Sequence, residues 1–217
     1  MFVALELPAT VALGLSAWAQ ELAAEGVRPV AAADLHVTLC FLGETAAASV
    51  DALGEAVAGA VGGAGPVALS VSGGLWLPRR RPRVLAVGVD GPGLGALQAR
   101  VAAALVAGGW YEPERRPYLG HVTVARVRFR GAGPVRAARG SAAAAGPAAP
   151  PGPAGGRGSA AAAGPAAPPG PAAAAPAVAP PALTFAADTV AVVRSHLGSG
   201  PARYEPLTRI ALSGPPR

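Results

Sequence analysis

Apolar residues along this chain recur with two different periods, which predict a mixture of strands and helices. Runs rich in β-branched and aromatic residues predict strands. They cover residues 1–7, 34–42, 67–77, 83–89, 119–127, 183–193 and 204–212. Apolar residues three or four positions apart predict three helices, which run from Val11 to Leu22, from Val50 to Val61 and from Leu94 to Leu105. Thr10 is the predicted N-cap of the first helix.

The order of these elements is not a regular alternation of strand and helix. Strand, helix, strand and helix are followed by a hairpin, whose turn is the segment PRRRP at residues 78–82. A helix, a strand and a final pair of strands complete the order. This order predicts an α+β fold with mostly antiparallel sheets and helices on their outer faces.

A tandem repeat interrupts the pattern. The segment GSAAAAGPAAPPGPA occurs at residues 140–154 and again at residues 158–172. Proline blocks helix and sheet pairing, and alanine and glycine offer little burial to offset the entropy lost on ordering. We therefore expect residues 140–181 to be a disordered insertion. The catalytic domain would be formed by residues 1–139, with both histidine motifs described below, and by the final strands in residues 182–217.

Charge and cysteine content narrow the classes of function. The net charge of +6 comes entirely from arginine, because the chain has no lysine, and arginine suits phosphate oxygens. A single cysteine, Cys40, excludes an internal disulfide and a Cys-rich zinc site. The first residues lack a basic segment before their apolar run, and no long apolar span follows. We therefore expect a cytoplasmic protein with no membrane partner.

Two of the three histidines share one local sequence. Residues 35–39 read LHVTL and residues 120–124 read GHVTV. In a strand, residues two positions apart point to the same face, so each motif presents an imidazole and a hydroxyl side by side. Two such strands lying next to each other would combine the side chains of His36, Thr38, His121 and Thr123 in one site.

This set of side chains suits the hydrolysis of a phosphodiester. A neutral imidazole can take a proton from water while a protonated one gives a proton to the leaving oxygen. Threonine hydroxyls can donate hydrogen bonds to the phosphate oxygens. Zinc binding by the same histidines is the rival interpretation, but no third ligand has a suitable spacing. We therefore expect no metal and no cofactor.

Two further groups are interpreted as lying outside this chemistry. His196 follows Arg194 and Ser195 at a predicted strand end, and we expect it at the surface or behind the site. The arginines at residues 79–81 and 83 are interpreted as a solvated turn. The alternative is contact with an RNA backbone, which would make affinity fall as salt is added.

Several segments together resemble one known family. MFVALELP at the start, DLHVTLCFLGE and HVTVAR around the two motifs, and VAVVRSHL and RYEPLTR near the end are similar to the two-histidine (2H) phosphoesterases. Within them, the chain resembles the bacterial and archaeal RNA 2′,3′-cyclic phosphodiesterases, long named 2′-5′ RNA ligases. The resemblance covers nearly the whole chain except the repeat. It implies a bilobal fold with pseudo-twofold symmetry and one His-x-Thr strand from each lobe lining a central cleft.

The resemblance also implies an activity and roles for residues. The activity would be hydrolysis of a 2′,3′-cyclic phosphate, on RNA ends or small cyclic nucleotides, to a 2′-phosphate. His36 would be the proton donor and His121 the proton acceptor, although the near-symmetric motifs leave this assignment open. Thr38 and Thr123 would contact the phosphate. Alternatives from the sequence are a non-catalytic nucleotide- or RNA-binding module on the same fold and 2′-5′ ligation by reversal. We expect a monomer.

The two motifs diverge five residues after each histidine, at Phe41 and Arg126. The resemblance implies that a base stacks on Phe41 and that Arg126 binds phosphate; a core phenylalanine and a solvated arginine are the alternatives. Strict alternation would put both on the face opposite the histidines, so each strand would have to twist, bulge or end there. The chain departs from the family pattern at Gly120, where proline is common, and at Val124, where leucine is usual.

Overall fold

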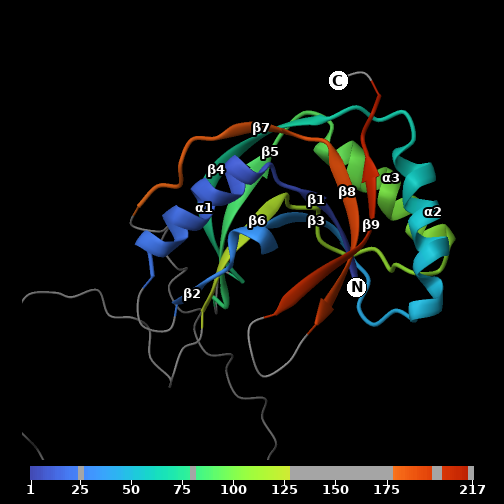
Figure 1. Ribbon diagram of the computed structural model, residues 1–217, viewed down its shortest axis with the longest axis horizontal. Helices are drawn as coiled ribbons and strands as arrows, with labels where there is room; N and C mark the ends of the chain where they lie inside the picture. The colour runs from blue at the N-terminus through green and yellow to red at the C-terminus, as the bar shows by residue number, and fades with distance from the viewer. Residues whose placement is uncertain (24–26, 79–81, 128–177, 197–201, 215–217) are drawn as a thin grey trace, which may run out of the picture.

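A computed structural model describes residues 1–23, 27–78, 82–127, 178–196 and 202–214 (Figure 1). Nine strands form one antiparallel sheet. The strands are β1 (Phe2–Glu6), β2 (Val27–Pro29), β3 (His36–Phe41), β4 (Val67–Leu77), β5 (Val84–Asp90), β6 (His121–Val127), β7 (Thr184–Ala187), β8 (Thr189–His196) and β9 (Arg203–Ala211). The helices are α1 (Ala9–Glu21), α2 (Val50–Val61) and α3 (Leu94–Ala107), with 3-10 turns η1 (Ala32–Asp34) and η2 (Ala47–Ser49).

The strand order divides the sheet into two lobes that meet at its centre. The order is β7-β4-β5-β6-β3-β1-β8-β9, and β2 pairs with β6 off this path. One lobe is therefore β3, β1, β8 and β9, and the other is β6, β5, β4 and β7. The predicted α+β class, the antiparallel pairing and the two lobes are confirmed, with both lobes belonging to one continuous sheet.

The sheet is curled so that its two ends approach each other. β7 pairs with β4 at one end, β8 pairs with β1 near the other, and only Asp188 separates β7 from β8. Six strand spacings of about 4.8 Å would put them about 29 Å apart in a flat sheet, whereas one intervening residue spans about 7 Å. Figure 1 shows β7 running over the top of the molecule from one lobe to the other.

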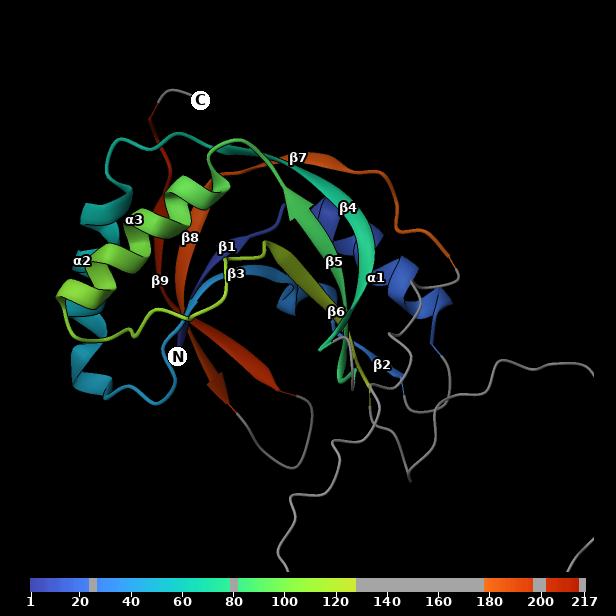
Figure 2. The same ribbon diagram turned by 180° about the vertical axis from the view of Figure 1, so that it is seen from behind.

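All three helices cover the same face of the sheet. α1 contacts β6 and β2, whereas α2 and α3 pack on each other and on β3, β8 and β9 (Figure 2). Between helices and sheet lies the main core, and its largest fully buried side chains include Leu5, Leu15, Leu53, Leu85, Leu105, Val37 and Val122. Because side chains alternate along a strand, the residues between these core positions lie on the other face, here called the open face.

Two predictions about element boundaries are wrong. Thr10 does not cap α1, which begins at Ala9 after Pro8 and has no side-chain cap. Proline presets the φ angle for a helix start, so Thr10 falls inside the first turn. The predicted strand at residues 183–193 is two strands, divided at Asp188, whose backbone carbonyl accepts a hydrogen bond from the Leu212 amide at 2.7 Å. An unbroken apolar run does not reveal that the chain changes lobes.

Other boundaries differ by a few residues. The two motif strands begin at the histidines themselves, about two residues later than predicted, and β2 was not predicted. Both copies of the repeat and the turn arginines 79–81 lie outside the described residues. The insertion, its boundaries and the turn therefore stay predictions. Within the described part of the chain, no helix is long and apolar enough to cross a membrane.

Candidate active site

The two His-x-Thr motifs lie side by side at the centre of the sheet. β3 and β6 are antiparallel and pair at Val37 and Val122, both completely buried on the helix side. One residue to either side of this pair, His36 therefore stands opposite Thr123 and Thr38 opposite His121, all on the open face. Residues directly opposite have Cβ atoms about 4.5–5.5 Å apart, and diagonal neighbours such as the two histidines about 7–8 Å.

Both imidazole rings are held in the same way. His36 Nδ1 lies 2.8 Å from the carbonyl oxygen of Asp34, and His121 Nδ1 lies 2.8 Å from that of Leu119. Since a carbonyl only accepts, each Nδ1 carries a hydrogen and donates it. Each Nε2 is then the atom that changes protonation, as a base in the neutral ring and an acid in the cationic ring. The shared contact leaves the same ring nitrogen, Nε2, free of this backbone bond in both motifs.

A bulge in each motif strand brings the fifth residue after the histidine back to the open face. On β3 the partners of β1 jump from Thr38 to Cys40, and on β6 the partners of β5 jump from Thr123 to Ala125. The bulge breaks the alternation, as the burial pattern shows: two consecutive positions are buried before an exposed one in each strand. The local irregularity that the sequence required is present in both copies.

The two divergent residues have different surroundings. Phe41 is 60% exposed, so it is not the core residue that the alternative interpretation assumed. Arg126 is exposed, and its Nη2 donates to the hydroxyl oxygen of Tyr204 at 2.8 Å. Arg126 comes from one lobe and Tyr204 from β9 of the other. This hydrogen bond therefore joins the lobes beside the two histidines.

Aromatic rings enclose one histidine. The rings of His36 and Phe2 stack with centroids 4.6 Å apart, and the edge of the Tyr204 ring packs on His36 with centroids 5.1 Å apart. Phe2 and Tyr204 were not singled out as site residues from the sequence, although both stand in segments, MFVALELP and RYEPLTR, that carry the family resemblance. Their position in these two segments was the signal from which the sequence could have identified them as site residues.

These surroundings act on the protonation of His36. Burial lowers its pKa below the usual value of 6.5, and the positive charges of His121 and Arg126 lower it further, while the hydrogen bond to the Asp34 carbonyl raises it. Desolvation disfavours the charged ring, and like charges nearby do the same. In the substrate-free protein, His36 therefore loses its proton more readily than an ordinary histidine.

Tyr118 and Cys40 lie next to the first motif: the tyrosine holds the motif strand in place, and the cysteine does not act as a nucleophile. The Tyr118 hydroxyl donates to the backbone carbonyl of Thr38 at 3.1 Å and so ties the motif strand to the segment before β6. Burial raises the pKa of the Cys40 thiol to about 11, which keeps it protonated and unreactive near neutrality. Within the described ranges, no group of three or more His, Cys, Asp or Glu side chains could hold a metal ion.

His196, the third histidine, lies away from the two motifs. His196 is exposed and its Nε2 lies 2.8 Å from the Glu205 carboxylate at the end of the β8–β9 pair, so it has the surface position expected.

Gly120 is buried directly before His121. A Cβ atom there would lie 2.5 Å from the Val89 carbonyl oxygen and 2.7 Å from Leu94 Cδ2. The Val89 backbone and the Leu94 side chain fill the space, which is why glycine suits this position.

Comparisons with known proteins identify the family. The LigT-like phosphoesterase family matches residues 5–86, a range that contains the first motif. RNA 2′,3′-cyclic phosphodiesterase of Escherichia coli (strain K12) is 34% identical over 128 residues, which are 58% of this chain and 70% of that protein. This chain belongs to the LigT-like phosphoesterase family. RNA 2′,3′-cyclic phosphodiesterase of Geobacillus stearothermophilus is 33% identical over 103 residues, 46% of this chain but only 32% of that protein.

Solved structures of the family share the whole fold. TT0787 of Thermus thermophilus superimposes with a TM-score of 0.66 at 23% identity, and the match covers 98% of this chain and 97% of TT0787. Escherichia coli LigT complexed with 3′-AMP gives a TM-score of 0.63 at 24% identity, with the same coverage. The curled two-lobed sheet is therefore a fold that this chain shares with Escherichia coli LigT.

Proposed function

We propose that this protein is an RNA 2′,3′-cyclic phosphodiesterase, a hydrolase that opens the cyclic phosphate at an RNA end and leaves a 2′-phosphomonoester. Small cyclic nucleotides would be alternative substrates. The family membership and the curated relatives support the reaction class. The observation that carries the proposal for this chain is the placement of two equivalently held imidazoles diagonally across β3 and β6, each opposite the other motif's threonine.

In this proposal the two Nε2 atoms act on opposite sides of one phosphorus atom. The Nε2 of His121 takes a proton from a water molecule, whose oxygen attacks the phosphorus. The bond from phosphorus to the ribose 3′-oxygen breaks, and the Nε2 of His36 gives that oxygen its proton. The diagonal separation of about 7–8 Å between the two Cβ atoms leaves room for a phosphate between the rings. One proton is taken and one is returned, so the histidine pair must exchange protons with solvent before the next turnover.

The remaining site residues bind the substrate in this proposal. The hydroxyls of Thr38 and Thr123 have no hydrogen-bond partner among the described side chains, which leaves them to donate to the non-bridging oxygens as negative charge grows there. Arg126 adds a charged donor for the same group. Phe41, exposed on the same face, offers a ring on which a base stacks.

The test is incubation of the purified protein with an oligonucleotide ending in a 2′,3′-cyclic phosphate, in the presence of EDTA. We expect turnover that the chelator does not reduce, with a 2′-phosphate as the product. A 3′-phosphate product would show that the ribose 2′-oxygen, and not the 3′-oxygen, is the leaving group. Binding of the oligonucleotide without turnover would favour the non-catalytic module instead, and loss of activity in EDTA would overturn the two-histidine mechanism.

A further inference from the structure

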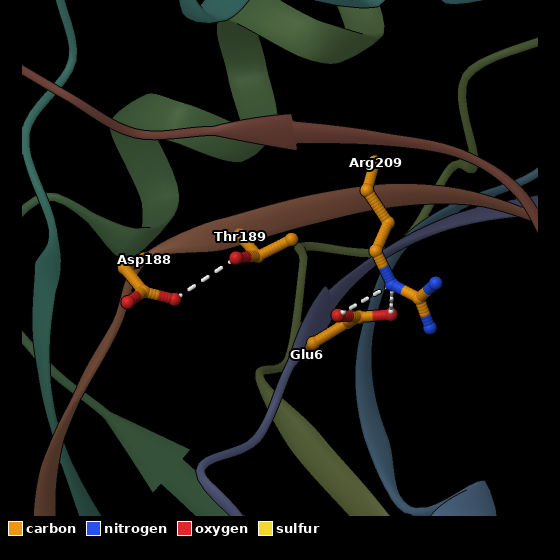
Figure 3. Close-up of polar contacts among 4 residues, drawn as sticks. All are labelled: Glu6, Asp188, Thr189 and Arg209. Atoms are coloured by element: carbon orange, nitrogen blue, oxygen red, sulfur yellow. Dashed lines mark hydrogen bonds and ion pairs between the residues drawn. The ribbon is translucent and has the colours of Figure 1, made fainter.

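Next to His36, the open face carries an ion pair that the two-histidine mechanism does not use. Arg209 Nε lies 2.8 and 3.0 Å from the two carboxylate oxygens of Glu6 (Figure 3). Glu6 is the β1 residue paired with His36, so one strand spacing of about 4.8 Å separates them. The ion pair is therefore a direct neighbour of the candidate catalytic group.

The backbone around Arg209 explains how its side chain reaches that position. Arg209 is paired with Ala191 on β8, and Ala191 is paired with Ala4 on β1, all on the open face. Both alanines are almost completely buried, at 0% and 1% exposure. Their small side chains leave a path along which the arginine crosses β8 and meets Glu6. Larger residues at these two positions would hold the guanidinium away from His36.

The pair leaves most of the guanidinium available to a ligand. Arginine has five N–H donors, and only the one on Nε binds Glu6. Neither terminal nitrogen has a hydrogen-bond partner among the described residues, and the Arg209 side chain is 59% exposed. Both ions are partly in water, so the pair adds little to folding stability. Its effect is to fix the orientation of a cation beside His36.

A second cation near His36, Arg126, has a different anchor. Arg126 is bonded to Tyr204, which is five residues before Arg209 on β9. Arg126 lies on β6, whereas Glu6, which holds Arg209, lies on β1, and these two strands flank β3 on its two sides. The two guanidinium groups therefore have separate anchors. Arg126 is placed for the cyclic phosphate, and Arg209 is therefore left for another anionic group of the substrate.

We infer that Arg209, oriented by Glu6, binds the 5′-phosphate group of the nucleotide that carries the cyclic phosphate. In RNA this group is the phosphodiester that continues the chain, the nearest other anion in the substrate. Arginine commonly binds such phosphate oxygens through the forked N–H donors of its guanidinium, and here Glu6 holds that guanidinium in place. The inference rests on the proposed function and deepens it: the site prefers an RNA end to a cyclic mononucleotide without a 5′-phosphate.

The test compares two substrates, 2′,3′-cyclic CMP and its 5′-phosphorylated form, in wild type and Arg209→Ala. We expect Arg209→Ala to lower kcat/KM on the 5′-phosphorylated substrate by about 10-fold and to leave the unphosphorylated one nearly unchanged. Arg209→Lys should recover only part of the difference, because lysine lacks the fork. Equal loss on both substrates, or no loss on either, would overturn the inference.

A matched control lies on the same strand. Arg203 pairs with His196 on the face opposite Tyr204, so Arg203→Ala removes one exposed positive charge from β9 without touching the open face. It should leave the ratio of the two kcat/KM values unchanged. Direct binding of 5′-phosphorylated 3′-CMP to wild type and Arg209→Ala, measured by calorimetry, separates the two proposals. Weaker binding by the variant supports the subsite even if no cyclic substrate is hydrolysed, in which case only the proposed function fails.

Discussion

Val37 and Val122 face each other at the centre of the sheet, and the two motifs extend from this pair in opposite directions. The pseudo-twofold axis of the fold passes between them. Because each motif runs antiparallel to the other, each histidine meets the partner motif's threonine rather than its own equivalent. In the proposed mechanism, a phosphate lying over the axis would therefore be contacted by both lobes at once, and neither lobe alone would supply the complete set of groups.

Removing either imidazole should nearly abolish activity. We expect His36→Ala and His121→Ala each to lower kcat by about 10²–10⁴-fold, the usual contribution of a positioned acid or base. The assay is product formation from a cyclic-phosphate oligonucleotide. His196→Ala is the matched control, since that histidine is at the surface with Glu205, and should be close to wild type. If one of the two motif variants keeps full activity, the paired mechanism is wrong.

Arg126 should set the position of one limb of the pH profile. A general acid must be protonated, and the pKa of His36 is lowered by burial and by the charges of His121 and Arg126. The limb of the kcat/KM profile that His36 controls should thus lie at lower pH than an unperturbed histidine would give. Arg126→Gln removes one positive charge, raises the pKa of His36 and moves this limb to higher pH, besides weakening substrate binding.

The shift tests the effect of charge on His36 and is independent of the assignment of acid and base. A bell-shaped profile gives the two pKa values of the histidine pair, so the limb that His36 controls should move to higher pH in Arg126→Gln under either assignment. Arg100→Gln, a change at an exposed arginine of α3, should move neither limb and serves as the control. An unchanged profile in Arg126→Gln would show that the arginine does not act on His36 through charge.

Phe41→Ala should weaken substrate binding without affecting the fold. Stacking of a base on an aromatic ring contributes about 1–3 kcal/mol, and this loss should appear in KM or in the Kd of a substrate analogue. Because the side chain is 60% exposed, little core packing is lost and the melting temperature should not change. Leu13→Ala, at an equally exposed apolar residue on α1, is the control and should leave KM unaltered. Unchanged binding in Phe41→Ala would remove the residue from the site.

Gly120→Ala should destabilise the protein by about 1–3 kcal/mol, the usual effect of overpacking. The added methyl would meet the Val89 carbonyl oxygen and Leu94, and a backbone shift that relieves the clash would also move His121. Gly59→Ala in α2 has open space around it and should instead stabilise by about 0.5–1 kcal/mol. Urea unfolding of both variants measures the difference. A Gly120→Ala protein as stable as wild type would contradict the steric argument.

Deletion of residues 140–176 should leave both melting temperature and turnover nearly unchanged. The segment has no large apolar side chain to bury, and shortening a loop changes its closure entropy only slowly. Thermal unfolding and the cyclic-phosphate assay are the measurements. A large fall in the melting temperature would show that the repeat packs on the domain.

The sequence predicts most of the fold and the centre of the site because both depend on local patterns. Strand periodicity places Thr38 beside His36 and Thr123 beside His121, and a core position between them is apolar in both motifs. The need for an irregularity before Phe41 and Arg126 also follows from alternation alone. The kind of irregularity does not, because a bulge depends on how the neighbouring strand pairs, and the structure supplies that register.

Contacts between distant segments could not be predicted in this way. The hydrogen bond from Arg126 to Tyr204 joins residues 78 positions apart in the sequence, and the one from Arg209 to Glu6 joins residues 203 apart. The first depends on the curl of the sheet, and the second on the strand order, which places β9 two strands away from β1. The division at Asp188 was hidden for the same reason: both strands are apolar, and only their partners differ.

The single residue between β7 and β8 has a consequence for the timing of synthesis. All of β7, β8 and β9 follow the repeat in the sequence, and they complete one lobe at β4 and the other at β1. A growing chain has both histidine motifs by residue 127, yet it lacks β7 from one lobe and β8 and β9 from the other, together with the tyrosine beside His36 and the arginine beside Glu6. The ribosome must translate residues 128–183 before β7, β8 and β9 can join the sheet, so a nascent or prematurely terminated chain carries both histidines but lacks the later side chains around them.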